Sequence, residues 1–262
     1  ILTIIYLMIF LINTSFGKET KWNMNSLIER GGLFYSPTST DPYSGEGFDL
    51  HENGAILVKG SFEDGKRIGQ WSVYSASGVR SRTEKYIKGV LVELVEYDST
   101  NIGGDEIPHG AVKKWYEDGQ LNVSGFYAKG IREKTWYAWY PNGQIESKFS
   151  FENGKPDGKS EVWFENGKVK IEKQFGKNGL EGLSREWLEN GLQKAAINFK
   201  DNKKHGYSTY WDENGDSLEY GKFISGQRVG IWNIWERWGL DSLRVKGEGD
   251  YDNSIRNGTW NW

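Results

Sequence analysis

Three histidines are the first side chains to consider for chemistry in this sequence. His51, His109 and His205 stand far apart in the chain, and no pair has the spacing of a metal site on a helix or hairpin. A histidine without such a partner is more often a solvent-facing loop residue than a ligand or a general base. We therefore interpret all three as loop residues.

The segment 212–216 has the alternating acidic pattern of the first half of a calcium loop. However, Ser217 stands where that loop needs Gly, and Phe223 stands where it needs Glu. An Asx-rich turn explains the same letters. No Gly-x-Ser-x-Gly elbow occurs, and the absence of cysteine excludes thiolate nucleophiles, disulfides and thiolate metal sites. The sequence predicts no catalytic residue, no metal and no cofactor, and so a protein that is not an enzyme.

Composition indicates a chain rich in turns and in aromatic packing. Among 262 residues there are 34 Gly, 13 Trp, 14 Tyr and 12 Phe, and the formal net charge is −3. Glycine is well above its usual share of about 7%, which favours many turns. The aromatic rings supply apolar surface for a folded core. The weakly acidic balance argues against a nucleic-acid partner, which would select a basic patch.

Glycines recur with a period of 24 residues, interrupted once by 17 additional residues. We predict that they mark hairpin turns: Gly54, Gly78, Gly119, Gly143, Gly167, Gly191, Gly215 and Gly239. A second marker lies nine residues before each, and we number it position 1 of units 1 to 8: Gly45, Gly69, Gly110, Lys134, Gly158, Gly182, Gly206 and Gly230. A ninth unit begins at Gly258. Two turn markers in each unit predict two strands in each unit.

Two aromatic positions repeat with the units, and we predict that both form the core of the repeat. Position 6 is aromatic in seven of the eight units, six of them with Trp: Trp115, Trp139, Trp163, Trp187, Trp211 and Trp235. Position 18 is aromatic in units 1 to 7: Phe62, Tyr86, Tyr127, Phe151, Phe175, Phe199 and Phe223. In unit 8 the ring appears four residues late, as Tyr251, which indicates a four-residue insertion.

A third aromatic position is occupied in only some units. Position 3 holds Trp71, Trp136, Trp232 and Trp260. Because the other units lack this ring, we predict that the architecture does not need it and that these four residues form an exposed binding platform. Strict alternation places positions 3 and 6 on opposite faces of a strand. Either a bulge separates them or both faces carry aromatic rings.

The turn residues predict the local structure. Asn precedes five of the turn glycines and Asp precedes Gly119, which favours type I′ hairpin turns. A second turn recurs near position 21, where Asn178 and Asn202 replace the usual glycine as residues that tolerate left-handed geometry. About ten residues for each strand and turn are too few for a parallel crossover. The sequence predicts an all-β fold: an elongated array of antiparallel β-hairpins in one twisted sheet.

The remaining segments divide the chain into three parts. Residues 1–17 begin with a twelve-residue apolar run, too short to span a membrane, and are predicted as a signal peptide that lacks its basic region. Residues 18–44 are predicted as an N-terminal cap and residues 45–262 as the repeats, with an insertion at about 93–109. Export follows from the signal peptide. The alternative is a core strand or uncleaved anchor, which leaves the protein in the cytoplasm.

The units resemble a known repeat family. Residues 158–168, with the linking segment 151–158, resemble the MORN-repeat variant of bacterial proteins called YwqK-family antitoxins. Residues 27–35, followed by Pro42 to Gly45, resemble the segment that often precedes those repeats. The resemblance implies a MORN-like sheet that acts in binding or scaffolding, and it also implies a cytoplasmic antitoxin, from which a signal peptide departs.

These observations predict an exported, non-enzymatic repeat protein that binds a protein partner or a cell-envelope polymer along one sheet face. One alternative is an antitoxin-like protein that neutralises a partner toxin by direct binding. Another is a glycan-binding protein that stacks sugars on exposed Trp residues. A hydrolase ranks last, since no nucleophile and base pair is apparent. We expect no nucleic-acid partner and no stable membrane span in the mature chain.

Overall fold

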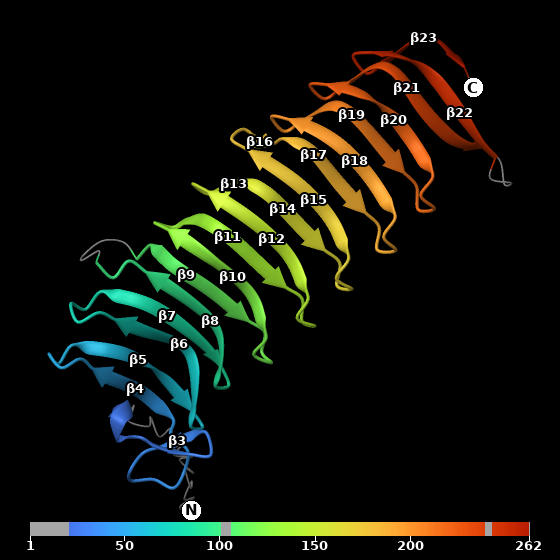
Figure 1. Ribbon diagram of the computed structural model, residues 1–262. Coiled ribbons are helices and arrows are strands. Elements are labelled where there is room, and N and C mark those ends of the chain that lie inside the picture. The colour runs from blue at the N-terminus through green and yellow to red at the C-terminus, as the bar shows by residue number, and fades with distance from the viewer. Residues whose placement is uncertain (1–20, 101–105, 239–242, 262) are drawn as a thin grey trace, which may run out of the picture.

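The protein is a long ribbon of β-strands laid side by side along one axis (Figure 1). The computed structural model describes residues 21–100, 106–238 and 243–261. In these residues, one sheet holds 21 strands, and β2 (Ile28–Arg30) and β3 (Leu33–Tyr35) form a separate hairpin. The predicted signal peptide, residues 1–17, lies outside the described residues.

The strands of the sheet follow one another in chain order, and almost every neighbouring pair is antiparallel. The first nine are β1 (Lys21–Asn23), β4 (Gly45–Leu50), β5 (Ile56–Glu63), β6 (Lys66–Tyr74), β7 (Arg80–Ile87), β8 (Val90–Tyr97), β9 (Pro108–Trp115), β10 (Leu121–Ala128) and β11 (Ile131–Trp139). Next come β12 (Ile145–Glu152), β13 (Lys155–Pro156), β14 (Gly158–Trp163), β15 (Val169–Gly176), β16 (Gly179–Leu180), β17 (Gly182–Trp187) and β18 (Gln193–Lys200). The last are β19 (Lys203–Trp211), β20 (Ser217–Ile224), β21 (Gln227–Trp238), β22 (Leu243–Asp252) and β23 (Ile255–Asn261). The predicted hairpin array is confirmed.

The turns within units contain the predicted glycines, but their type differs from the prediction. Seven of them have φ between 81° and 96°: Gly54, Gly78, Gly119, Gly143, Gly167, Gly191 and Gly215. Gly239 lies outside the described residues. Asn53 keeps an ordinary negative φ, its Oδ1 accepts a hydrogen bond from the Ala55 amide, and Gly54 donates to the His51 carbonyl. The prediction of type I′ turns is wrong here, because Asn forms an Asx turn and only Gly turns left-handed.

Left-handed residue pairs occur instead in the turns between units. Asp64 and Gly65, for example, have φ of 47° and 75°, and Asp201 and Asn202 have φ of 50° and 64°. These are the positive φ values that a two-residue type I′ turn requires. The prediction for Asn202 is therefore confirmed. That for Asn178 is wrong, because Gly179, with φ of 110°, takes the left-handed conformation in its place.

The insertion after unit 2 adds a single strand, β8. Every later unit therefore runs in the opposite direction across the sheet and turns its position 3 to the opposite face. Trp71 lies opposite Glu84, Glu84 opposite Leu94, and Leu94 opposite Lys113. Directly opposed side chains share a face, so Lys113 is on the face of Trp71 and its neighbour Val112, at position 3 of unit 3, is on the other. The turns within units move to the other edge of the sheet at the same point (Figure 1). Position 3 therefore faces opposite sides before and after the insertion.

The N-terminal residues pack onto the first units. Strand β1 pairs in parallel with β4, and a single 3₁₀ turn, η1 (Met24–Ser26), follows it. Tyr43 is buried together with Phe62 and Trp71, and Trp22 and Phe34 pack against this cluster. Apolar residues from 21–43 thus extend the aromatic cluster of the first two units.

Candidate binding surface

The four position-3 tryptophans do not form an exposed platform, and that prediction is wrong. Trp71 and Trp232 are 0% exposed and Trp136 is 9% exposed, while Trp260 is half-buried against the neighbouring cluster. In each unit we call the side that bears positions 3, 16 and 18 its core side and the opposite side its outer side. Trp71 and Trp232 are the most deeply buried aromatic residues in the described part of the chain.

Each position-3 ring lies on a glycine of the adjacent strand. A Cβ added to this glycine would meet the indole ring at less than 3.0 Å, so any larger residue would displace the ring. The glycine stands at position 16 of the preceding unit, eleven residues before the Trp: Gly60, Gly125, Gly221 and Gly249. The Trp strand has two extra residues at each contact: Lys59 and Ser61, on either side of Gly60, pair with Ser72 and Ile68 of the Trp strand.

The position-18 rings complete the packing from both sides. Phe223 contacts Trp232 edge-on at 5.0 Å between ring centroids, and Tyr251 contacts it edge-on at 5.9 Å. Edge-to-face contacts of this kind add to the energy of burial. Among the predicted position-18 core residues, Phe62 and Phe223 are buried, and the other five are half-buried: Tyr86, Tyr127, Phe151, Phe175 and Phe199.

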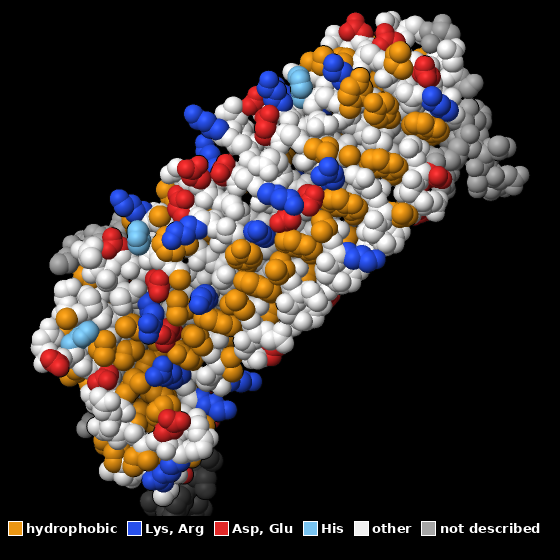
Figure 2. All heavy atoms as spheres, in the orientation of Figure 1, with side chains coloured by type: hydrophobic (Ala, Val, Ile, Leu, Met, Phe, Trp, Pro, Cys, Tyr) orange, Lys and Arg blue, Asp and Glu red, His pale blue; other side chains and the backbone are white. Residues whose placement is uncertain are grey.

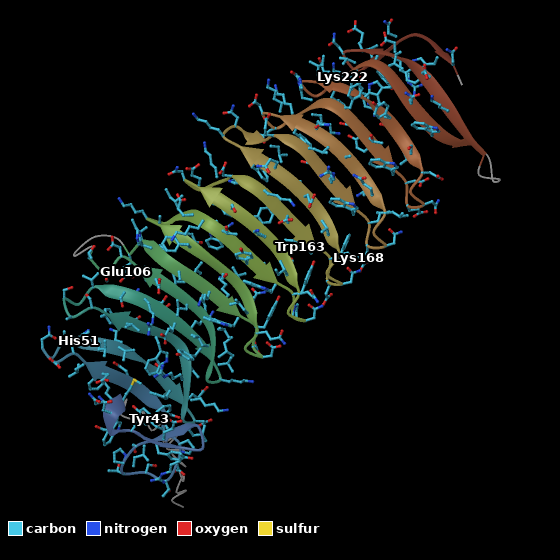
Figure 3. All side chains as sticks on the ribbon, viewed as in Figure 1. Tyr43, His51, Glu106, Trp163, Lys168 and Lys222 are labelled. Carbon is cyan, nitrogen blue, oxygen red and sulfur yellow. The ribbon has the colours of Figure 1, made fainter. Side chains whose placement is uncertain are left out.

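The position-6 tryptophans are half-buried and lie on the outer side, so the prediction that they form the core is also wrong. These residues are Trp115, Trp139, Trp163, Trp187, Trp211 and Trp235. In unit 4 the pairing runs without a gap in the Trp strand from Trp136 to Trp139, and Trp139 stacks on Tyr137 of its own strand at 5.7 Å. Both faces therefore carry aromatic rings. Figure 3 shows Trp163 at the turn end of β14.

Each position-3 indole is covered by an arginine that was not predicted from the sequence. Four residues before each position-3 Trp stands an Arg whose guanidinium carbon lies 4.3–4.6 Å from the indole centroid: Arg67, Arg132, Arg228 and Arg256. Each indole is thus held between a glycine and a guanidinium, which is a stabilising cation–π stack. The signal was present in the sequence as Arg-x-x-x-Trp together with the earlier glycine.

Two of these arginines are paired with carboxylates of the chain. Arg228 donates to Glu219 at 2.5 Å and to the Tyr251 hydroxyl at 3.3 Å. Arg67 lies 3.9 Å from Glu84 and donates to the Tyr86 hydroxyl at 3.1 Å.

Tyr86 in turn donates to Glu84 at 2.8 Å. Burial raises the pKa of Tyr86, and the bond to Glu84 raises it further, so that this hydroxyl stays a neutral donor.

Arg132 has the same stacking without a carboxylate. Its guanidinium lies 4.6 Å from the Trp136 ring and 5.5 Å from the Phe151 ring, and no hydrogen bond or ion pair from it is found within the described ranges. It lines an open groove of about 450 Å³ on the core side of units 3 and 4, which we call the Arg132 groove. Its lining includes Val112, Val123, Arg132, Trp136, Phe149 and Phe151.

Units 5 to 7 replace the stack by a different arrangement. Position 3 is Ser160, Ser184 and Ser208, between 1% and 6% exposed, and their hydroxyl oxygens have no hydrogen-bond partner in the described part of the chain. Position 16 of the preceding unit is correspondingly large: Phe149, Lys173 and Ile197. A small residue at one position thus accompanies a large one at the other.

The outer side of these central units carries ion pairs. Lys159 lies 2.7 Å from Glu161 and 2.8 Å from Glu172, and Arg185 lies 3.6 Å from the second oxygen of Glu172. The hydrogen bonds to Glu161 and Glu172 raise the pKa of Lys159. Figure 2 shows such charged side chains interspersed between bands of apolar side chains on the visible face.

An exposed aromatic pair marks the outer side of units 7 and 8. Tyr207 and Tyr220 stack in parallel, with ring centroids 5.5 Å apart and an interplanar angle of 5°. They are 55% and 39% exposed, and Ile231, at position 2 of the next unit, is 61% exposed. Large apolar side chains held on paired strands in this way are candidates for contact with a partner.

The histidines take part in contacts between turns or strands. The His51 ring Nε2 lies 2.9 Å from the Tyr74 carbonyl, and the His109 ring Nδ1 accepts from the Lys129 amide at 3.2 Å. His205 accepts from the Ser225 amide at 3.5 Å. Each bond joins residues about one unit apart, which is a structural role.

The comparison with protein families agrees with this architecture. Residues 108–129, 132–153 and 156–177 match a family described as MORN repeat variant. Three consecutive units match the MORN repeat variant. Each match begins two residues before position 1, and the MORN-variant segments 108–129 and 132–153 contain the Arg132 groove. No curated protein matches the chain. Within the described ranges, no helix is long and apolar enough to cross a membrane.

Proposed function

We propose that this chain is a non-enzymatic repeat module that binds or scaffolds another protein. The observation that carries the proposal is the exposure of Tyr207, Tyr220 and Ile231 on the paired strands β19, β20 and β21. Aromatic side chains of this kind are enriched at protein interfaces because they bury a large area at low entropic cost.

The thinness of the array supports the same proposal. A single-layer sheet has two long faces, and each unit contacts only its neighbours, so contact area accumulates along the chain rather than in a pocket. MORN-variant units are consistent with such a role. Units 3 to 7 have one length and one register, so they present the same positions to a partner at regular intervals.

Cross-linking followed by mass spectrometry tests the proposal. The purified chain is incubated with the proteins of its source cell, and cross-links are compared between the wild type and Tyr207→Ser, Tyr220→Ser and Ile231→Ser combined. We expect one dominant partner whose cross-links to units 7 and 8 disappear in the triple variant. A wild-type chain that cross-links no protein more than a heat-denatured sample does contradicts the proposal.

Two narrower proposals rest on the sequence. An antitoxin that neutralises its toxin by direct binding is a special case of protein binding, supported by the resemblance of residues 158–168 to the YwqK family; co-expression that fails to relieve toxicity excludes it. Export is supported by the apolar run in residues 1–12. A reporter enzyme that is active only outside the cytoplasm, fused after residue 262, tests it. Glycan binding through position-3 Trp is not proposed, since those rings are buried.

A further inference from the structure

Three arginines occupy equivalent places in the array and differ in one respect. Arg67, Arg132 and Arg228 each stand two residues before position 1 of a unit and stack on the position-3 indole of that unit. Arg67 lies beside Glu84, at position 16 of the unit that contains its indole, and Arg228 lies beside Glu219, at position 14 of the unit before its indole. The chain thus has two places from which a carboxylate reaches this guanidinium.

Around Arg132 both of these places are apolar. Position 16 of the unit that contains Trp136 is Phe149, position 14 of the unit before it is Val123, and both line the Arg132 groove. Lys114 also lines the groove, and its Nζ forms an ion pair with Glu93 Oε1 at 2.7 Å. One positive charge therefore remains uncompensated, beside apolar walls where its equivalents have carboxylates.

The stacking also prepares Arg132 for a planar acceptor. The guanidinium carbon lies 4.6 Å from the Trp136 centroid and 5.5 Å from the Phe151 centroid, so two rings hold the group in place, and its N–H groups have no acceptor in the described residues. Such a fixed fork matches a carboxylate, which accepts two parallel hydrogen bonds. The groove is open along the sheet rather than closed into a pocket, a shape that suits an extended chain.

We propose that the Arg132 groove binds an extended segment of a partner protein that presents an Asp or Glu carboxylate to Arg132 and an apolar side chain to Val123 and Phe149. The partner carboxylate takes the place that Glu84 and Glu219 take at the equivalent arginines. The inference rests on the proposed protein-binding function and names the surface and the chemistry of the partner.

Short peptides test this directly. The probe is a fluorescein-labelled peptide of alternating Asp and Leu, and its matched control has Asn in place of each Asp. Fluorescence anisotropy with the full chain is expected to show about ten-fold tighter binding of the Asp peptide, which corresponds to about 1.4 kcal/mol. Equal binding of both peptides overturns the inference.

Arg132→Gln is the first variant, with Arg67→Gln as its matched control. Removing the unpaired guanidinium is expected to abolish the preference for the Asp peptide, whereas the same substitution at the paired arginine leaves it unchanged. An effect of equal size in both variants points to a general charge effect and overturns the inference.

Val123→Glu is the second variant, because it supplies Arg132 with an internal carboxylate in the place of Glu219. It is expected to lower affinity for the Asp peptide about ten-fold while far-UV circular dichroism is unchanged. Ile171→Glu, at position 14 of unit 5, adds the same charge outside the groove and is expected to leave binding intact. If Val123→Glu does not fold, the loss of Asp-peptide preference in Arg132→Gln remains the test of the inference.

Three further outcomes separate the explanations. Binding of free succinate as tightly as the Asp peptide overturns the claim of a protein segment. Self-association of the wild type in sedimentation, lost in Val123→Glu, shows that a second copy fills the groove and also overturns it. If the Asp peptide does not bind but a protein still cross-links to units 7 and 8, the inference about the groove is wrong while the proposed function stands.

Discussion

The units with Trp at position 3 and the units with Ser at position 3 build the same sheet in two ways. In unit 8, Trp232 fills the space above Gly221 and is covered by Arg228. In unit 6, Ser184 leaves that space to the larger Lys173, and Leu180 stands where the arginine would be. Unit 8 carries a four-residue insertion that unit 6 lacks, yet each contributes two long strands to the sheet.

The difference shows that position 3 and position 16 of the preceding unit fill the space between adjacent strands together, so that neither position alone determines the packing. A large ring with a glycine, or a serine with a large residue, fills comparable space between adjacent strands, in keeping with the close packing that interiors require. The tryptophan units gain a buried ring and a cation–π stack. The serine units gain neither. Both kinds of unit leave one buried polar group without a partner in the described residues: the indole N–H, as at Trp232, or the serine hydroxyl, as at Ser208.

The largest effect is expected from Trp232→Ala. Deleting a fully buried indole costs about 3–5 kcal/mol of local stability. Trp163→Ala, at half-buried position 6, is expected to cost roughly half as much, because part of that ring already lies in water. Hydrogen exchange of the amides in β20 to β22 and in β14 to β15 measures each loss, since a repeat array opens locally. A larger cost for Trp163 contradicts the assignment of the core.

Gly221→Ala comes next, with an expected cost of about 1–3 kcal/mol, because its Cβ would overlap the indole of Trp232. The same substitution in a Trp232→Ser background is expected to be nearly neutral, since it then resembles a serine unit. Hydrogen exchange of the single and double variants gives the coupling between the two positions. Additive costs would show that the glycine and the ring are not a packing pair.

Ser208→Ala is expected to be neutral or to stabilise the protein by about 1 kcal/mol, because it removes a buried hydroxyl that has no partner in the described residues. Ser81→Ala is the control: its hydroxyl donates to the Val73 carbonyl at 3.2 Å, so its loss is expected to destabilise. Urea denaturation compares the two. Destabilisation by Ser208→Ala beyond that of Ser81→Ala would contradict the account of the serine units.

Effects of similarly small size are expected from the arginines. Arg228→Gln loses both the cation–π contact and the bond to Glu219, at a cost of about 1 kcal/mol. Arg132→Gln loses only the stacking and is expected to cost less. Urea denaturation in low and high salt checks this: only the Arg228 cost should fall with salt. A salt-dependent cost at Arg132 would mean that it has a carboxylate partner in the chain.

Much of the fold could be predicted from the sequence because turns are local. The 24-residue period, the left-handed glycines and the number of strands in each unit follow from residues such as Gly143 and Gly167, whose conformation depends on their neighbours in the chain. The turn types were harder to predict. Asn53 fits a left-handed turn as well as an Asx turn, and the second occurs.

The core could not be predicted by counting how often a ring recurs. Position 6 carries a Trp in most units, yet its Trp163 is half-buried, whereas position 3 carries a Trp in few units and its Trp71 is fully buried. The reason is that position 3 and position 16 of the preceding unit fill one space together. The residue at position 3 therefore varies between units, while the combined size of the pair stays similar. The Arg132 groove depends on a comparison of three units at once, which requires knowing which residues face one another across strands.

Fluorine NMR of the chain labelled with 5-fluorotryptophan tests the central claim that position 3 forms the core. Resonances are assigned by single Trp→Phe substitutions, and a soluble paramagnetic agent is then added. We expect the signals of Trp71 and Trp232 to remain sharp while that of Trp163 broadens. Broadening of Trp71 and Trp232 with a sharp Trp163 would contradict the account.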